Sequence, residues 1–309
     1  MSNQTTSHIL MIRPANFGYN EQTAVSNAFQ SNDQSISQAE ISRRAVAEFD
    51  GMVAKLRSVG VNVHVIEDSP EPKKPDAVFP NNWLSMHRNG TLITYPMYTT
   101  NRQAEIREDV IEQVKEKFAV KKRVRFDRFT QQHLFLEGTG SMILDRDNRL
   151  VYACVSARTE PNLLHFFAEW AEYDPVLFLA VDRNDQEIYH TNVMMALGDR
   201  FVVICMDSIK EKNDRLTLKE KFLKTKKEII DISYEQMLKF AGNMLQVRND
   251  AGKTYLVMSR QAYDSLNERQ IAAIESHTTI LVCKIDTIEN YGGGSARCMM
   301  AEVFLPLNP

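Results

Sequence analysis

The sequence predicts an α/β fold, because segments with the apolar pattern of strands alternate with segments of helical spacing along the whole chain of 309 residues. The order strand, strand, helix, strand recurs in about five units of about sixty residues each, although no sequence words repeat between them. No linker rich in proline or serine divides the chain. We therefore expect one domain that covers residues 1–309.

The first half of the chain opens with an apolar strand, and its first helix ends at Gly60. The tripeptide RNG lies between two apolar runs and predicts a hairpin. A long polar stretch over 14–33 has no predicted element and is the candidate lid of a site. The predicted elements are a strand over 7–14, a helix over 35–60, a strand over 61–67, hairpin strands over 83–87 and 91–96, a helix over 101–118 and a strand over 121–127.

The second half repeats this order, with the clearest helix in PNLLHFFAEWAE, where proline stands at the start. The predicted elements are strands over 133–145 and 150–156, a helix over 161–172, a strand over 175–181, strands within 192–206, a helical region within 208–240, strands over 242–249 and 254–260, a helix over 261–276, and strands over 278–285 and 299–306.

The charge balance argues against nucleic acid or an anionic membrane surface as a partner, because the net charge is only -3. The lysine-rich stretch over 207–228 has acidic residues between its basic ones, which is typical of a solvated helix face. No apolar run approaches the roughly 18 residues of a membrane helix. We expect a cytoplasmic protein that binds a small molecule, and the sequence leaves homo-oligomerisation undecided.

The four cysteines form no CxxC pair and no metal-ligand spacing with the seven histidines, so neither a disulfide framework nor a metal site is predicted. Cys154, Cys205 and Cys283 lie in apolar runs and are expected to be buried. Cys298 differs, because it follows GGGSAR directly before the last strand. Glycines allow a ligand to approach the backbone closely, so Cys298 is a candidate nucleophile, with Arg297 and a histidine as candidate partners. The alternative is a flexible turn before a core cysteine.

Three other stretches place polar residues where strands begin or end. His190 opens an apolar strand after a turn-like stretch, and Glu137 stands between an apolar run and GTG, where a carboxylate needs a polar partner. DAVFPNNW places Asp76, Asn81 and Asn82 near another strand start. Ordinary turn chemistry is the alternative interpretation of each stretch taken alone.

Four motifs in this order, DAVFPNNW, LEGTG, IYHTN and GGGSARCMMAE, resemble the guanidine-modifying or pentein superfamily, which includes arginine deiminases, dimethylarginine dimethylaminohydrolases, amidinotransferases and, most similar, citrulline-utilisation hydrolases. The resemblance implies a five-bladed αβ-propeller of ββαβ units with a central active site. It also implies that Cys298 is the nucleophile, that His190 is the general acid and base, and that Glu137 holds the nitrogen side of the substrate. No metal or organic cofactor is implied.

The resemblance further implies which residues bind the amino-acid head of the substrate. Arg158 in VSARTEPN and Arg102 in YTTNRQAE are similar to residues that bind the α-carboxylate, and Asp76 is similar to a ligand of the polar head. Solvated charges at helix ends are the alternative interpretation of both arginines.

One departure from the superfamily concerns the substrate. Relatives that act on a guanidinium usually have a carboxylate where this chain has Asn82, and deiminases have an aspartate where this chain has Asn192. Neutral amides suit a ureido group, which offers both N–H and C=O, so citrulline is the expected substrate, hydrolysed to ornithine, ammonia and carbon dioxide. The alternatives are hydrolysis of arginine or dimethylarginine to citrulline, amidino transfer to an amine, and a non-catalytic binding protein.

Overall fold

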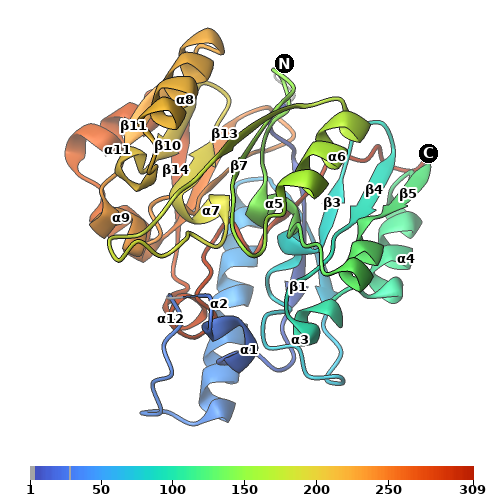
Figure 1. The fold of residues 1–309 in the computed structure, drawn as a ribbon. Coiled ribbons are helices and arrows are strands. Elements are labelled where there is room, and N and C mark those ends of the chain that lie inside the picture. Colours follow the sequence, from blue (N-terminus) through green and yellow to red (C-terminus); the bar gives the residue numbers. More distant parts are fainter. Residues whose placement is uncertain (1–3, 28) are drawn as a thin grey trace.

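The fold of this computed structural model, which describes residues 4–27 and 29–309, is mixed α/β (Figure 1). This confirms the predicted fold class. The strands are β1 (His8–Arg13), β2 (Asn62–Glu67), β3 (Leu84–Met86), β4 (Thr91–Thr94), β5 (Lys122–Arg125), β6 (Ile143–Asp145), β7 (Leu150–Cys154), β8 (Asp174–Phe178), β9 (Met195–Leu197), β10 (Phe201–Ile204), β11 (Glu228–Asp231), β12 (Leu245–Arg248), β13 (Thr254–Ser259), β14 (Thr279–Cys283) and β15 (Ala301–Val303).

The helical segments follow the strands in a regular order. They are α1 (Glu21–Ala24), α2 (Gln38–Ser58), η1 (Pro80–Asn82), α3 (Thr100–Gln103), α4 (Glu108–Lys117), η2 (Phe126–Gln132), α5 (Gly138–Ser141), α6 (Pro161–Ala171), α7 (Thr191–Met194), η3 (Met206–Ser208), α8 (Lys212–Lys224), α9 (Tyr234–Leu238), α10 (Arg260–Ser265), α11 (Glu268–Glu275) and α12 (Asp286–Gly292). No helix among the described residues combines the length and apolar character that a membrane span requires.

The strands form three-stranded units of one pattern. In each unit the first two strands pair antiparallel, the last two pair parallel, and the parallel pair is connected through a helix. The orders β6-β7-β8, β9-β10-β11 and β12-β13-β14 are separate sheets. The orders β15-β1-β2 and β3-β4-β5 have the same pairing and join through β15 and β3 into one six-stranded sheet.

The long helix α2 illustrates how the sequence specifies these elements. Ser37 caps it, because the Ser37 hydroxyl accepts a hydrogen bond from the backbone N–H of Glu40 at 3.2 Å. Its apolar side chains recur at helical spacing and are buried, namely Ile41, Ala45, Phe49, Met52, Val53 and Leu56. The chain leaves the helix at Gly60, whose φ of +82° favours glycine.

Several predicted boundaries were wrong. The strand expected over 133–145 is limited to β6, because the GTG sequence forms the short helix α5 and Gly138 has a φ of +45°. The helix expected over 261–276 is two helices, since Asn267 caps α11 in a capping box with Gln270. The helix expected over 101–118 is α3 and α4, and the region 208–240 also contains β11.

The start of the first strand in each unit is the feature that positions the site. Helix α5 precedes β6, helix α7 precedes β9, and both lie in the middle of the molecule between the outer helices (Figure 1). Helix α5 also contacts η1, which precedes β3. The polar residues at these strand starts therefore converge, although they are far apart in the sequence.

Candidate active site

Six of the predicted site residues line one narrow cavity of about 20 Å³ at these strand starts. They are Asn82 before β3, His190 before β9, Cys298 before β15, Asp76, Arg102 and Arg158. Gly140 allows the close approach, because a Cβ atom there would lie 2.3 Å from Asn82 Nδ2 and 2.8 Å from the His190 ring. The structure therefore brings the separated motifs together, and the GTG sequence is required for close packing as well as for a turn.

The Cys298 sulfur lies among amide groups. Asn192 Nδ2 lies 3.4 Å from Sγ, and Asn243 Nδ2 lies 3.2 Å from it. Cys298 is only 5% exposed, so these contacts are shielded from water. Both amide N–H groups can therefore donate a hydrogen bond to the sulfur of the predicted nucleophile.

Asn243 is a site residue that the sequence analysis did not identify. Its Oδ1 accepts a hydrogen bond from the backbone N–H of Arg297 at 3.1 Å, and its Nδ2 donates to the carbonyl of Asn192 at 2.8 Å. These two backbone partners fix the amide orientation, so the donor Nδ2 is the amide atom nearer to Cys298 Sγ, at 3.2 Å, and Oδ1 lies 3.6 Å from it. The available signal was AGNML, a glycine and a polar residue directly before an apolar strand, as in the other motifs.

His190 and Glu137 form a buried pair. His190 Nε2 lies 2.7 Å from Glu137 Oε2. Burial lowers the pKa of His190 to about 4, despite the opposing effect of Glu137, so the imidazole is neutral at neutral pH. Burial alone would raise the pKa of Glu137, but Arg158, His190 and Arg102 hold it well below its usual range. The ionised carboxylate accepts from Nε2, which leaves Nδ1 as the proton acceptor.

The position of Glu137 changes its expected role. Its second oxygen, Oε1, accepts a hydrogen bond from the backbone N–H of Tyr98 at 2.8 Å. Both carboxylate oxygens therefore have partners within the protein, and Glu137 is not among the residues that line the cavity. The geometry fits a residue that orients His190 rather than one that binds the nitrogen side of a substrate.

Arg102 lines the cavity, and its guanidinium is also engaged within the protein. Its Nε and Nη2 each donate to a Glu105 oxygen at 2.9 Å. Its Nη1 donates to Asn82 Oδ1 at 2.9 Å. Because the Glu105 fork fixes the guanidinium, Arg102 sets the orientation of the Asn82 amide. Glu105 was not identified from the sequence.

The two neighbouring asparagines have different surroundings. Asn82 Nδ2 is buried without a hydrogen-bond partner, and the Asn82 side chain lines the cavity. Asn81 does not line it, and its Nδ2 donates to the Thr139 hydroxyl at 3.3 Å. The expectation of a substrate contact therefore fits Asn82, whereas Asn81 connects η1 to α5.

Asp76 and Arg158 line the cavity as expected, but the N-terminal segment occupies both. Asn20 Nδ2 and the Thr23 hydroxyl donate to Asp76 Oδ2 at 2.7 and 3.2 Å. Arg158 Nη2 donates to the Ser26 hydroxyl at 2.7 Å. Burial raises the pKa of Asp76, and its other oxygen, Oδ1, has no partner. Part of the candidate lid over 14–33 therefore lies directly over the site.

Arg297 makes its side-chain hydrogen bonds to groups other than the sulfur. Its side chain donates to the carbonyl of Met300 and to Glu302 Oε2, both at 2.9 Å. The remaining cysteines are buried as predicted, and burial raises the pKa of Cys154 to about 12 and the pKa values of Cys205 and Cys283 to about 11. No cluster among the described residues has the composition of a metal site.

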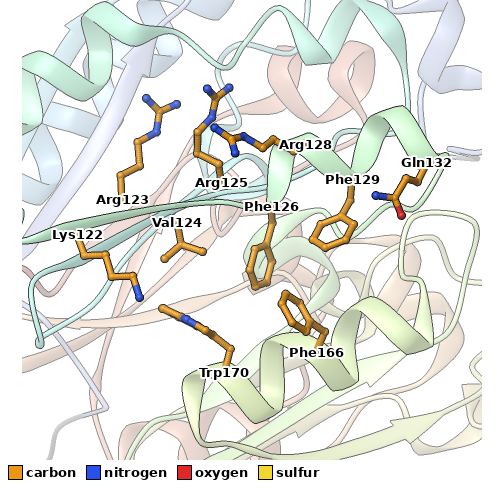
Figure 2. A pocket seen from close by; sticks show the side chains of 10 residues that line it. All are labelled: Lys122, Arg123, Val124, Arg125, Phe126, Arg128, Phe129, Gln132, Phe166 and Trp170. Carbon is orange, nitrogen blue, oxygen red and sulfur yellow. The ribbon is translucent and has the colours of Figure 1, made fainter.

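A much wider hollow, of about 450 Å³, lies between β5, η2 and α6 (Figure 2). Aromatic rings from Phe126 and Phe129 lie opposite those of Phe166 and Trp170, and the basic side chains that line the hollow come from β5 and η2. Neither cysteine nor histidine nor a carboxylate lines it, so it has no nucleophile and no general base. The predicted nucleophile and the predicted histidine lie instead in the narrow central cavity.

A family profile described as "N,N dimethylarginine dimethylhydrolase, eukaryotic" matches residues 13–305 and so spans all four motifs. The chain belongs to this family. It is accordingly a member of the pentein superfamily of guanidino-modifying enzymes and a hydrolase of C–N bonds. A comparison with curated proteins found no match.

Solved structures agree with the fold. The N-terminal domain of ArgZ, covalently bound to a reaction intermediate, matches with a TM-score of 0.73 and 19% identity over 98% of this chain and 99% of that chain. Complete ArgZ is described as an arginine dihydrolase from the ornithine–ammonia cycle in cyanobacteria. It matches with a TM-score of 0.74 and 18% identity, and the match covers 98% of this chain but only 41% of ArgZ. A dimethylarginine dimethylaminohydrolase adduct with S-methyl-L-thiocitrulline matches with a TM-score of 0.63 and 14% identity over 96% of this chain and 98% of that chain.

Proposed function

We propose that the protein hydrolyses citrulline at the ureido carbon, through a covalent Cys298 intermediate, and releases ornithine, ammonia and carbon dioxide. The observation that carries this choice of substrate is the Asn82 amide. Arg102 holds Asn82 Oδ1, so the buried and unpartnered Nδ2 is directed to the substrate. A ureido oxygen accepts a hydrogen bond from such a donor, whereas every nitrogen of a guanidinium is itself a donor or positively charged.

The mechanism begins with proton transfer from the Cys298 thiol to Nδ1 of neutral His190. The thiolate, stabilised by Asn192 and Asn243, attacks the ureido carbon and forms a tetrahedral adduct. Protonated His190 then gives its proton to the leaving nitrogen, the C–N bond breaks, and ammonia departs. Water, deprotonated by His190, then attacks the S-carbamoyl group. The S–C bond breaks, the thiol regains its proton, and the released carbamate separates into ornithine and carbon dioxide.

The amino-acid head of citrulline would bind to Arg158 and Asp76. Their charges complement the α-carboxylate and the α-ammonium group, and Asp76 Oδ1 has no partner in the closed structure. A cavity of about 20 Å³ holds little more than one water molecule. Citrulline therefore displaces the segment that contains Asn20, Thr23 and Ser26, which is the part of 14–33 that we propose as the lid.

A second candidate substrate is a guanidinium compound, arginine or dimethylarginine. Two observations favour it: the family profile names dimethylarginine, and Asn192 Oδ1 is a buried acceptor without a partner beside Cys298. ArgZ is described as an arginine dihydrolase, so arginine also belongs among the test substrates.

We also propose that the five three-stranded units are the blades of a five-bladed αβ-propeller, within one catalytic domain over residues 1–309. The shared pairing of the units and the convergence of their first strands support this arrangement. No metal or organic cofactor takes part in the proposed mechanism.

The test is the release of ornithine and ammonia from citrulline by the purified protein, with arginine and dimethylarginine in parallel. Cys298→Ala serves as the blank, and trapping of a labelled carbamoyl group on Cys298 reports the intermediate. Ornithine from citrulline, absent with Cys298→Ala, supports the proposal. Citrulline formed from arginine or dimethylarginine without ornithine refutes the choice of substrate, and Asn82→Asp should then increase turnover.

Two further outcomes separate the remaining alternatives. A product that forms only when an amine acceptor is added indicates amidino transfer. If no substrate turns over and Cys298 also resists alkylation at neutral pH, the protein is a binding protein rather than a hydrolase.

A further inference from the structure

A cavity of about 640 Å³ lies at the opposite ends of the strands whose starts form the candidate active site. The turn after β3 and the turn after β6 contribute its walls, together with the end of α6 and Phe304. None of the candidate active-site residues lines it. Its lining residues are His87, Arg88, Asn89, Thr91, Lys122, Arg146, Asp147, Arg149, Trp170, Ala171, Glu172, Tyr173 and Phe304.

Arg146 is the unusual residue in this cavity. Its side chain is only 8% exposed, yet no described residue accepts a hydrogen bond from its guanidinium, and its Nε is buried without a partner. Glu302 Oε2 lies 3.9 Å from Arg146 Nη2, too far for a hydrogen bond, and already accepts one from Arg297 Nη2 at 2.9 Å. A buried arginine with unfilled donors is costly unless a ligand fills them.

Further positive charges surround Arg146. The Arg146 and Arg88 guanidinium groups lie 3.9 and 5.2 Å from the centre of the same Phe304 ring. Burial, and then Arg248 and Arg146, lower the pKa of Arg88, and the opposing effect of Asp147 is smaller. Burial together with Arg146 and Arg149 lowers the pKa of His87 to about 3.

The charge balance of the lining residues indicates the class of ligand. Four lining residues are cationic and two, Asp147 and Glu172, are acidic. Glu172 lies 3.8 Å from Arg149, whose guanidinium donates to the carbonyls of Ala171 and Glu172. Arg146 therefore has one carboxylate within ion-pair range, Glu302, and no hydrogen bond to it, and the excess of two positive charges among the lining residues matches an oxyanion with about two negative charges.

We propose that this cavity binds a small ligand that carries a phosphate group, with the Arg146 guanidinium donating to the phosphate oxygens. A guanidinium offers parallel N–H donors whose spacing matches that of phosphate oxygens. Lys122 adds charge at the rim, where its ammonium lies 5.2 Å from the centre of the Trp170 ring. The volume of about 640 Å³ leaves room for an organic body beside the aromatic walls. This site is independent of the proposed citrulline hydrolysis.

Isothermal titration calorimetry of the complete chain with inorganic pyrophosphate, at constant ionic strength balanced with chloride, tests the proposal. We expect saturable binding that Arg146→Gln weakens at least tenfold. Arg183→Gln, which removes a surface arginine paired with Glu235 outside the cavity, is the matched control and should bind as the unmodified protein does.

Lys122→Glu is a second variant, at an exposed position where a substitution should not affect folding. It therefore tests the site even if Arg146→Gln does not fold. It reverses one charge at the rim and should also weaken binding at least tenfold. The proposal is overturned if pyrophosphate gives no saturable heat, or if the cavity variants bind it as tightly as Arg183→Gln does.

Discussion

Replacing Asn243 by aspartate tests whether amide donors stabilise the Cys298 thiolate. The substitution keeps the side-chain shape and the oxygen that accepts from the Arg297 N–H, but it puts a carboxylate oxygen where Nδ2 lies 3.2 Å from the sulfur. A hydrogen bond to a charged group contributes about 1.5–3 kcal/mol, and about 1.4 kcal/mol corresponds to a tenfold change in an equilibrium. We therefore expect Cys298 to be alkylated at least about tenfold more slowly at neutral pH.

The assay is the rate of iodoacetamide modification of Cys298 across pH, read by mass spectrometry of its peptide. At high pH hydroxide ionises the thiol in both proteins, so the rates of Asn243→Asp and the unmodified protein should converge. Asn184→Asp, the same change on an exposed turn, should leave the profile unchanged. An unchanged rate for Asn243→Asp at neutral pH refutes the reasoning, and a rate that stays slow at every pH indicates lost packing instead.

Acid should weaken the fold through His190. Burial lowers its pKa from 6.5 to about 4, so the unfolded chain binds the proton first as pH falls, and about 3 kcal/mol of stability is lost between pH 6.5 and pH 4. In urea titrations at both pH values, His190→Gln should lose about 3 kcal/mol less of its free energy of unfolding than the unmodified protein does. An equal loss in the two proteins contradicts the prediction. Arg102→Met removes the partner of buried Glu105 and should lower the free energy of unfolding by about 3–5 kcal/mol in denaturant titrations. A cost below about 1 kcal/mol would indicate a well-solvated pair.

The sequence indicated most of the candidate site because its residues occupy similar positions next to strands. Cys298, His190 and Asn82 each stand shortly before the first strand of a unit, and their glycine-rich or turn-like surroundings distinguish them from core positions. Asn243 occupies the same kind of position, but one asparagine after one glycine does not stand out from ordinary turns. Its role depends on a sulfur that lies 55 residues away in the sequence.

The roles of the charged residues were harder to predict than their presence. Whether Arg102 binds a substrate carboxylate or the carboxylate of Glu105 depends on side-chain distances of a few ångströms, which no periodic pattern encodes. Glu137 is similar, since its partners Tyr98 and His190 come from two separate segments. Strand and helix classes follow from local pattern, whereas these pairings follow from the tertiary fold.

In the proposed binding mode, the N-terminal segment over the site is an intramolecular competitor of the substrate. Thr23 and its neighbours form hydrogen bonds with Asp76 and Arg158 through neutral groups, so a ligand that offers only one charge exchanges one set of hydrogen bonds for another and gains little. A free amino acid offers both an ammonium and a carboxylate and replaces these neutral contacts with two ion pairs. The apparent affinity for any ligand falls in proportion to the fraction of protein molecules in which the segment is displaced. The segment would therefore disfavour ligands whose α-amino or α-carboxyl group is blocked by acylation or a peptide bond, before they reach Cys298.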